Sequence, residues 1–481
     1  MAVPARRCGR GHRRTRVPER SKRITAIVLA AGHGSRFGGR KLLAGLEGKA
    51  ILQHVLDAIA RAGIDDAVVV LGGDASAIEA EIDWRRERRI VNPDPGRGLA
   101  SSLRLGMAAV DNDAAAVLIA LGDQPRLEPG AIRSVLDAEQ RSGRPVVVPA
   151  FRGGRGRNPV LLDRSAFGLV EEAEGDRGLG PILDAHPELV HEVRIDGENP
   201  DVDTREDLRE LAEAAWAERV RANREQVDRL REVPDGKDFY APVTGLFRAD
   251  PRRTDEAVLE KLRALVIPGE TWLDIGAGAG RYALPLALLA ARVIAVDPSR
   301  GMLDALRAGM EEHGIPNIDV IEGRWPDVQP RPTAGVALIA HVSYDIEGIG
   351  AFLDAMEGSA RRLCVAVLME RQPASLADPC WPRVHGEERS PLPALPEFVD
   401  VLRARGREPR VDLMEREARR FASRDELEGF LRRQLWVAEG GPKDAAFQAA
   451  IDDLVVEDET GLFLRGVMPM SVGVVTWSPP G

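Results

Sequence analysis

The sequence is poor in the residues that build disulfide scaffolds and zinc sites. Only three cysteines occur in 481 residues, Cys8, Cys364 and Cys380, and they are widely scattered. An odd, scattered set without a short paired spacing argues against a disulfide framework and a zinc ribbon. We therefore expect a reduced, cytoplasmic protein.

Long hydrophobic runs are also missing. The stretch 283–291 is among the longest, and it ends at Arg292, well short of the roughly 18 apolar residues that a membrane helix needs. No membrane span is predicted. The first 22 residues are rich in arginine and have no apolar stretch, so a secretory signal is not expected there. We interpret residues 1–22 as a basic disordered tail.

An excess of positive charge is absent as well. The net charge is −10, which disfavours nucleic acid as a partner, because the phosphate backbone rewards clustered Lys and Arg. The hydrophobic fraction of 44% and the charged fraction of 30% are typical of a globular protein. The length favours two or three domains. Small-molecule substrates remain the expected partners.

What the chain does contain is short apolar runs alternating with amphipathic stretches, in two series. This alternation predicts an α/β fold with two doubly wound, Rossmann-like domains. We expect domains at 23–212 and 238–481, joined by a helical linker at 213–237 that breaks near Pro234. Residues 372–396 are predicted to form an irregular insertion or lid, and residues 461–477 a β-hairpin.

The densest motif of the first series runs from Leu29 to Lys41 and reads LAAGHGSRFGGRK, directly after the first expected strand. Glycines let backbone N–H groups approach phosphate oxygens, and Arg36 and Lys41 supply positive charge for a triphosphate. The motif is not a Walker A loop, and Phe37 stands where a dinucleotide fingerprint needs its third glycine. His33 is not assigned the role of a base.

Carboxylates follow two later segments. Asp123 comes directly after the apolar run 115–121, at the edge of the sheet where ligands of α/β proteins bind, and suits Mg²⁺. Asp203 lies just before an expected helix. There the residues alone favour a helix cap, by Asp203 or Thr204, over a metal ligand.

Together these motifs resemble the MobA-like nucleotidyltransferases, most closely the molybdenum cofactor cytidylyltransferase branch, over roughly residues 24–211. The sequences NPD at 92–94, GLASSL at 98–103, RNPV at 157–160 and DVDTREDL at 201–208 add to the likeness. The resemblance implies a nucleotide-diphosphosugar-transferase-like fold, CTP as nucleotide and a molybdopterin-type acceptor. It assigns catalysis to Arg36, Lys41 and Asp123, and Mg²⁺ to Asp123 and Asp203. The implied nucleotide-binding residues are Leu29, Ala30, Ala31, Gly32, Gly34, Ser101 and Ser102.

The second series carries an apolar strand, 271–275, that runs into the turn GAGAG at 276–280. Asp297 ends the next apolar run, about 20 residues after the glycines, where nucleotide-binding units place the carboxylate that holds a ribose. A nicotinamide site is the rival interpretation, but Arg281 stands at its third glycine. Asp274, just before the turn, suits a cationic ligand.

This pattern resembles the class I S-adenosylmethionine-dependent methyltransferases over roughly residues 239–477. The resemblance implies that S-adenosylmethionine is bound by Asp274, Gly276, Gly278, Gly280 and Asp297. His341, Ser343 and Tyr344 follow the fourth expected strand, where substrate groups gather. His341 is a possible base or an ordinary strand-end histidine. Arg324 and Trp325 are either adenine contacts or a surface pair.

The sequence thus predicts a bifunctional transferase. Cytidylyl transfer would be joined to methyl transfer onto an unidentified small molecule, and association with molybdenum enzymes or their maturation factors would fit the fusion. Two alternatives stay open. The phosphate acceptor could be a sugar phosphate or polyol phosphate, and the second domain could be a non-catalytic module that binds S-adenosylmethionine.

Overall fold

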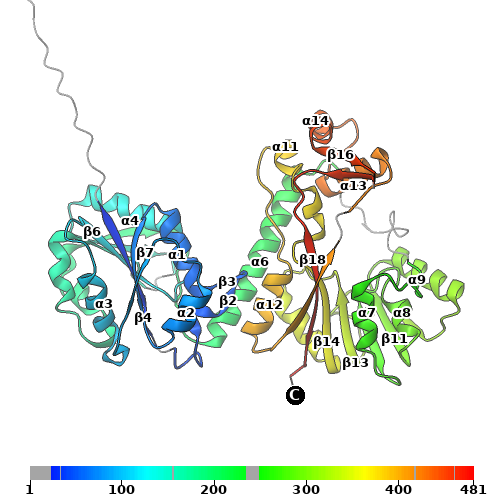
Figure 1. Cartoon of the computed structure of the whole chain (residues 1–481), viewed down its shortest axis with the longest axis horizontal. Helices are drawn as coiled ribbons and strands as arrows, with labels where there is room; N and C mark the ends of the chain where they lie inside the picture. Colours follow the sequence, from blue (N-terminus) through cyan, green and yellow to red (C-terminus); the bar gives the residue numbers. More distant parts are fainter. Residues whose placement is uncertain are drawn as a thin grey trace, which may run out of the picture. The chain divides into compact units, whose positions relative to one another are not determined.

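The computed structural model describes residues 23–32, 34–153, 156–234, 249–416, 419–459 and 461–480. The expected basic tail, His33 and residues 235–237 of the expected linker lie outside these ranges. The chain forms two compact units, residues 1–43 with 50–202 and residues 44–49 with 203–481. Each unit is an α/β sandwich with helices on both faces of its sheet, as the alternation of apolar runs predicts (Figure 1).

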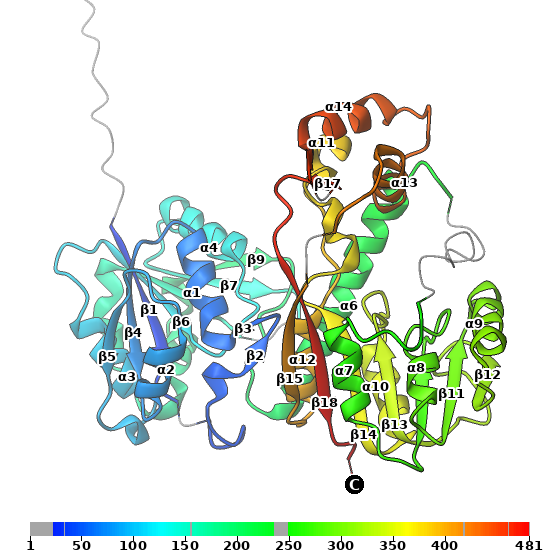
Figure 2. The same cartoon turned by 45° about the vertical axis from the view of Figure 1, so that its right-hand side comes forward.

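The first unit contains a mixed seven-stranded sheet in the order β5-β4-β1-β6-β8-β7-β9, in which only β8 runs antiparallel to its neighbours. The strands are β1 (Ile24–Ala30), β4 (Asp66–Leu71), β5 (Arg88–Val91), β6 (Ala116–Leu121), β7 (Val146–Phe151), β8 (Val160–Asp163) and β9 (Val190–Ile195). The main helices are α1 (Ile51–Arg61), α2 (Ala75–Glu81), α3 (Leu99–Ala108) and α4 (Pro129–Ser142), which are labelled in Figure 2, and α5 (Gly180–Ala185). The strands β1 and β6 are buried along almost their whole length, which explains their continuous apolar sequences.

The second unit has a sheet of the order β12-β11-β10-β13-β14-β18-β15, with β18 antiparallel to both of its neighbours. Its strands are β10 (Thr271–Ile275), β11 (Arg292–Asp297), β12 (Ile318–Glu322), β13 (Ala334–Ala340), β14 (Ala360–Met369), β15 (Arg410–Arg416) and β18 (Met470–Trp477). The helices α7 (Ala257–Ala264), α8 (Ala283–Ala287), α9 (Arg300–His313), α10 (Ile349–Glu357) and α12 (Leu395–Ala404) flank this sheet. The short hairpin β2–β3 (Gly45–Leu46, Lys49–Ala50) mostly belongs to this unit, where the Gly48 N–H donates to Asp400.

In both sheets the direction in which successive strands are added reverses at a central strand. The chain runs from β1 outward to β4 and β5, then returns to place β6 on the other side of β1; β10 and β13 are related in the same way. At such a switch point the loops after the two central strands diverge and leave a crevice at their carboxyl ends. The loops singled out from the sequence follow β1, β6, β10 and β13, and therefore open onto these two crevices.

The helix α6 (Arg205–Leu230) crosses the boundary expected at residue 212. It begins with a capping box in which the Thr204 hydroxyl accepts from the Asp207 N–H and the Asp207 carboxylate accepts from the Thr204 N–H. Trp216 on this helix is buried, packs edge-on against Phe398 and donates to the Ile346 carbonyl. Because of this packing α6 is part of the second compact unit and not a free linker.

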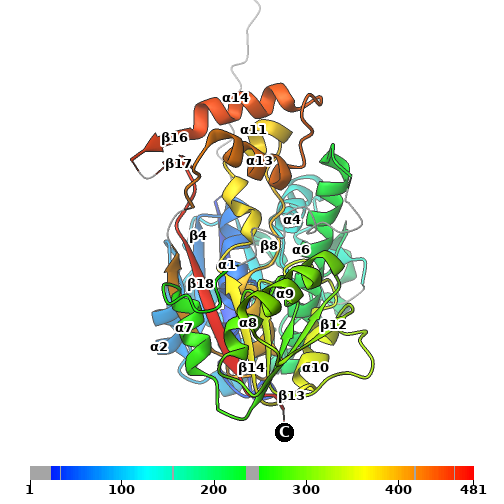
Figure 3. The same ribbon diagram turned by 90° about the vertical axis from the view of Figure 1, so that its right-hand side faces the viewer.

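Residues between β14 and β18 form a small helical cap in addition to α12 and β15. The cap comprises α11 (Trp381–His385), α13 (Arg424–Leu435), α14 (Asp444–Leu454) and the hairpin β16–β17 (Val455–Asp458, Gly461–Leu464), and has its own apolar core around Trp381, Leu431 and Phe447 (Figure 3). The expected irregular segment 372–396 is therefore partly helical. The expected hairpin at 461–477 is wrong, since β17 pairs with β16 and β18 pairs with β14 and β15. No helix in the described ranges is both long and apolar enough to cross a bilayer.

Candidate functional site

Lys41 and Asp123 form the centre of the candidate site in the first unit. The two residues are 82 positions apart, and the Lys41 Nζ donates to the Asp123 Oδ2 at 2.6 Å. The side chains are 10% and 22% exposed, respectively, so the ion pair is largely shielded from water. The second carboxylate oxygen, Asp123 Oδ1, is buried and has no hydrogen-bond partner in the described part of the chain. A buried oxygen without a partner is costly unless a ligand satisfies it.

The loop that precedes Lys41 is held by one carbonyl. The Gly34 oxygen accepts from the N–H groups of Phe37, Gly38 and Gly39 at 3.0 to 3.3 Å. Gly38 and Gly39 have φ values of 92° and 99°, a region that glycine adopts at low cost. Phe37 is buried and anchors the loop, whereas Arg36 is exposed at its surface. The loop thus carries an exposed cation, Arg36, and is followed by a largely buried cation, Lys41.

Asn92 connects two further motifs of the same unit. Its Nδ2 donates to the hydroxyls of Ser101 and Ser102, at 2.9 Å each, and its Oδ1 accepts from the Asp94 N–H. The Ser101 hydroxyl also donates to the Gly98 carbonyl. Both serines therefore shape the entry into α3, and their expected contact with the nucleotide stays a prediction.

The acidic motif at 201–208 reaches the site through its backbone. The Val202 N–H donates to the Asp123 carbonyl at 3.0 Å, and Asp201 accepts from the Gln124 amide at 2.7 Å. Asp203 belongs to the second unit, where its N–H donates to Asp207 ahead of α6. The helix cap is Thr204, one of the two residues that the sequence favoured for capping. The metal role of Asp203 stays a prediction.

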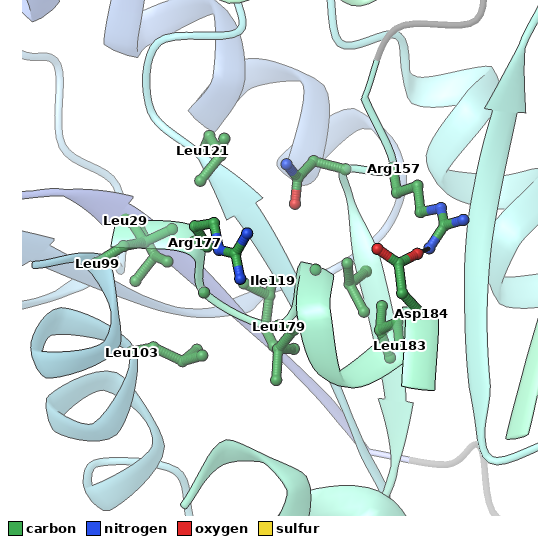
Figure 4. Close-up of a pocket in the computed structure, with 14 residues that line it drawn as sticks. Leu29, Leu99, Leu103, Ile119, Leu121, Arg157, Arg177, Leu179, Leu183 and Asp184 are labelled. Carbon is green, nitrogen blue, oxygen red and sulfur yellow. Dashed lines mark hydrogen bonds and ion pairs between the residues drawn. The ribbon is translucent and has the colours of Figure 1, made fainter. Parts of the chain in front are cut away.

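A pocket of about 390 Å³ opens beside this site (Figure 4). Leucine and isoleucine side chains from β1, α3, β6 and α5 line much of it, and Arg157 and Arg177 add positive charge. Arg157 is turned toward Asp184, with an Nη1–Oδ1 distance of 2.6 Å, whereas Arg177 has no ion pair with any described residue (Figure 4). The remaining lining residues include Asn158 and Val160 of the motif RNPV and residues 178–180.

The described residues contain no group of three or more His, Cys, Asp or Glu side chains placed to hold a metal ion. Mg²⁺ does not require such a group, because it commonly binds one or two carboxylates and takes its other ligands from water and substrate phosphates. The unpaired, buried Oδ1 of Asp123 fits that pattern. Asp123 is accordingly the residue in this unit that would hold the ion.

In the second unit the turn after β10 has the conformation expected for close approach to a ligand. Gly276, Gly278 and Gly280 have φ values of 74°, 54° and 85°. A Cβ on Gly276 would lie 2.4 Å from the Val342 Cγ2, so only glycine fits there without displacement. The Gly278 N–H donates to Asp297 at 2.9 Å, and the Ser299 N–H donates to the other oxygen of the same carboxylate at 2.8 Å. These bonds fix Asp297 beside the turn.

Asp274 is the most perturbed carboxyl group near this turn. It is 2% exposed, and burial, followed by the negative charge of Asp297, raises its pKa to about 7. Two acidic side chains held together in a low-dielectric site are unfavourable when both are ionised. A cationic ligand would relieve this repulsion. S-adenosylmethionine carries positive charge on its sulfonium and amino groups, so the residues present fit it.

The segment after β13 is strained and incompletely hydrogen-bonded. His341 and Ser343 have φ values of 57° and 97°, which non-glycine residues rarely adopt. The His341 Nδ1 and the Ser343 Oγ are buried without hydrogen-bond partners in the described ranges. Burial, followed by the charges of Arg416 and Arg281, lowers the pKa of His341 to about 4, so its imidazole is neutral at pH 7.

Two groups near this edge were not identified from the sequence, the Gln372 side chain and the cluster around Glu256. Gln372, 3% exposed, has neither amide atom hydrogen-bonded within the described residues. Glu256 accepts from Arg253 and Arg281 with one oxygen and from the Tyr282 hydroxyl with the other, each at 2.8 Å. No motif marks these residues, because their importance arises from burial and from partners distant in sequence. For Arg324 and Trp325 the sequence left open whether they contact adenine or form a surface pair. The structure buries Trp325.

Comparisons with known proteins agree with this division. A MobA-like NTP transferase domain matches residues 26–190, and a methyltransferase domain matches residues 273–356. Nicotine blue oxidoreductase of Paenarthrobacter nicotinovorans is 31% identical over 198 residues, which are 39% of this chain and 96% of that protein. The chain belongs to the MobA-like NTP transferase family. Its second half is a methyltransferase domain.

Further matches to the MobA-like half differ in how much of the other protein they cover. Bifunctional protein GlmU of Sorangium cellulosum is 34% identical over 128 residues, 25% of this chain and 27% of that protein, so the chain spans about a quarter of this relative. Among solved structures, Rv0371c of Mycobacterium tuberculosis is 32% identical, covers 40% of this chain and 98% of its own, and gives a TM-score of 0.37.

Proposed function

We propose that the MobA-like half transfers a cytidylyl group from CTP to a molybdopterin-type cofactor in a Mg²⁺-dependent reaction. The observation that carries this proposal is the shielded Lys41–Asp123 pair at the switch point of the sheet, with one carboxylate oxygen left without a partner. The preference for CTP rests on the resemblance of the sequence Ala30-Ala31-Gly32 to the cytidylyltransferase branch.

The chain's own groups can perform this transfer by positioning and charge. A phosphate oxygen of the acceptor is already anionic, so it attacks the α-phosphorus and displaces pyrophosphate without a strong base. Lys41 would neutralise charge on the phosphates from inside the loop, and Arg36 from its surface. Mg²⁺ held by Asp123 would supply further positive charge at the phosphates.

The pocket beside the site supports an acceptor with both an apolar and an anionic part. Its leucine-rich wall suits a flat or apolar body, and Arg177 suits phosphate, whereas Arg157 is paired with Asp184. A sugar phosphate or polyol phosphate, the alternative acceptor, would leave the apolar wall without matching surface. The name of the relative nicotine blue oxidoreductase indicates that a protein of this family acts on a different compound, so the acceptor requires a direct test.

That test is a screen of pyrophosphate release with the full-length protein, Mg²⁺ and each of the four nucleoside triphosphates. Molybdenum cofactor, a sugar phosphate and a polyol phosphate serve as separate acceptors. We expect release with CTP and molybdenum cofactor, and a loss of about 100-fold or more for Asp123→Asn. Asp113→Asn is the matched control, because Asp113 precedes β6 and pairs with Arg23 at the opposite edge. Release with a sugar phosphate instead would establish the alternative.

We further propose that the second half binds S-adenosylmethionine and transfers its methyl group to a small molecule. The positive-φ glycine turn, the fixed Asp297 and the buried Asp274, whose carboxyl pKa is raised, support this. When bound, the cofactor supplies an electrophilic methyl group. Asp297 would hold the ribose hydroxyls, and Asp274 would lie near the positive charge.

Calorimetry with S-adenosylhomocysteine tests the binding step without turnover. We expect the wild type to bind the ligand and Asp297→Ala not to bind it. Absence of binding by the wild type would contradict the proposal. Binding without methyl transfer to any acceptor would favour the alternative of a non-catalytic sensor. A cytoplasmic location and association with molybdenum enzymes or their maturation factors complete the proposal, and affinity purification of the tagged chain tests the association.

A further inference from the structure

Four buried polar atoms without hydrogen-bond partners among the described residues lie at one edge of the second sheet. The Nδ1 of His341 and the Oγ of Ser343 follow β13, and both amide atoms of Gln372 follow the neighbouring strand β14. Ser343 is 0% exposed and Gln372 is 3% exposed. Nearly all buried polar groups in proteins are hydrogen-bonded, so four unpaired atoms at one edge indicate a missing ligand.

Two contacts join the segments that carry these atoms. The His341 N–H donates to the Val367 carbonyl at 2.8 Å, and the Met369 N–H donates to the Tyr344 hydroxyl at 2.7 Å. Val342, between His341 and Ser343, lies directly against the glycine turn, as the 2.4 Å approach to a Gly276 Cβ shows. The unpaired atoms therefore border the place where the methyl donor is proposed to bind.

The charges that act on His341 are mostly positive. Arg281 and Arg416 both lie close enough to His341 to disfavour its protonation, and Glu256 opposes them. Glu256 is already shared between Arg253 and Arg281. No carboxylate pairs with Arg416 in the ranges that the structure describes. A negatively charged substrate would balance this surplus.

His341 and Tyr344 are poor proton acceptors at neutral pH. His341 has a pKa of about 4, and burial raises the pKa of the Tyr344 hydroxyl, which keeps it neutral at pH 7. A general base works best when its pKa is near the working pH. An alcohol or an ammonium group must lose a proton, and neither His341 nor Tyr344 would accept it readily. A carboxylate binds already deprotonated.

We propose that the carboxyl edge of β13 and β14 is the methyl-acceptor site, that His341, Ser343 and Gln372 hydrogen-bond the acceptor, and that this acceptor is a small carboxylate. The inference rests on the proposed methyl transfer. A carboxylate oxygen forms the new O–CH₃ bond with its lone pair, and the S–CH₃ bond breaks with its electrons going to sulfur. The carboxylate and sulfonium charges disappear together, so the products are a neutral ester and a neutral thioether, and no proton moves.

The experiment uses the full-length protein and S-adenosylmethionine labelled in its methyl group. Three substrate mixtures with the same carbon skeletons are compared: aliphatic and aromatic carboxylic acids, the corresponding alcohols and phenols, and the corresponding amines. We expect label in the carboxylic acid mixture, and release of that label as methanol under mild alkali. Methyl ethers and methylamines do not release methanol under these conditions.

Two substitutions of Gln372 test the residue and the charge. Gln372→Leu removes the hydrogen bonds, and we expect kcat/KM to fall at least tenfold while S-adenosylhomocysteine affinity stays unchanged. Gln372→Glu keeps the size but adds a negative charge, and we expect a larger fall. Ser359→Ala is the matched control. Ser359 is also buried with an unpaired hydroxyl, but it precedes β14 at the opposite edge, so its substitution should leave transfer unchanged.

The outcomes distinguish a failure of the proposed carboxylate acceptor from a failure of the proposed methyl transfer on which it rests. No binding of S-adenosylhomocysteine by the wild type would refute the proposed methyltransferase activity itself. If S-adenosylhomocysteine binds, three results would overturn the proposed carboxylate acceptor. These are label in the alcohol or amine mixture, label that is stable to alkali, and no transfer to any of the mixtures. Faster transfer by Gln372→Glu would likewise overturn it, since added negative charge favours a cationic substrate.

Discussion

Replacing Asp274 by Asn should stabilise the unliganded second unit at pH 8 while removing most of its affinity for S-adenosylmethionine. Asp274 is 2% exposed, and its pKa rises from 3.8 to about 7 on folding, first through burial and then through the charge of Asp297. The folded state therefore favours the neutral carboxyl group, whereas the unfolded chain ionises it freely above about pH 4. Asparagine has a similar shape and never carries that charge.

The size of the effect follows from the shift. One pKa unit corresponds to about 1.36 kcal/mol, so a shift of about three units costs the folded wild type at most about 4 kcal/mol at pH 8. This cost is absent below about pH 4, grows as the pH rises from 4 to 7, and is constant above 7. The variant should therefore gain most over the wild type at pH 8 and little at pH 4.5.

The assay is urea unfolding at both pH values, followed by a probe of the second unit such as its buried tryptophans, because a two-unit chain need not unfold in one step. Calorimetry with S-adenosylhomocysteine completes it. Asp297→Asn provides the contrast, since it disturbs the bonds from Gly278 and Ser299 and should destabilise by about 1–3 kcal/mol. Equal stability of Asp274→Asn and wild type at pH 8, or equal ligand affinity, would refute the reasoning.

Three further outcomes are expected. Ser343→Gly should raise the free energy of unfolding by about 1 kcal/mol, because the residue has a φ of 97°, and should slow methyl transfer; a stability loss would contradict the strain. Lys41→Met should lower kcat/KM for pyrophosphate release about 100-fold or more, while exposed Lys49→Met keeps the wild-type rate. The affinity for S-adenosylhomocysteine, measured from pH 5.5 to 8.5, should rise by up to about tenfold per pH unit as far as pH 7 and then level off. The reason is that the ligand's ammonium group favours ionised Asp274. An affinity that does not change with pH would argue against this pairing.

The sequence was sufficient for the features that are local. Continuous apolar runs gave β1, β6, β10 and β13, because strands buried on both faces need apolar residues at every position. The glycine turn after β10 was readable for a similar reason, since its positive φ values require glycine. The edge of the sheet at which Asp123 lies also followed from its place after an apolar strand.

Features that depend on partners far along the chain were not readable. The pairing of Lys41 with Asp123 spans 82 residues, and nothing in either motif specifies it. The strand β18 was misplaced in a local hairpin, because its true partners, β14 and β15, lie far earlier in the chain. Gln372 was overlooked in a segment rich in proline and polar residues. Its significance comes from burial without hydrogen bonds, which only the fold reveals.

The central claim is that one chain carries two separate transferase sites. It is tested most directly by incubating the full-length protein with α-³²P-labelled CTP, methyl-³H-labelled S-adenosylmethionine, Mg²⁺, molybdenum cofactor and the carboxylic acid mixture, and separating the products. We predict a ³²P-labelled cofactor and a ³H-labelled ester from the wild type, loss of ³²P alone in Asp123→Asn, and loss of ³H alone in Asp274→Asn. Absence of both labelled products from a folded wild-type protein would contradict the claim.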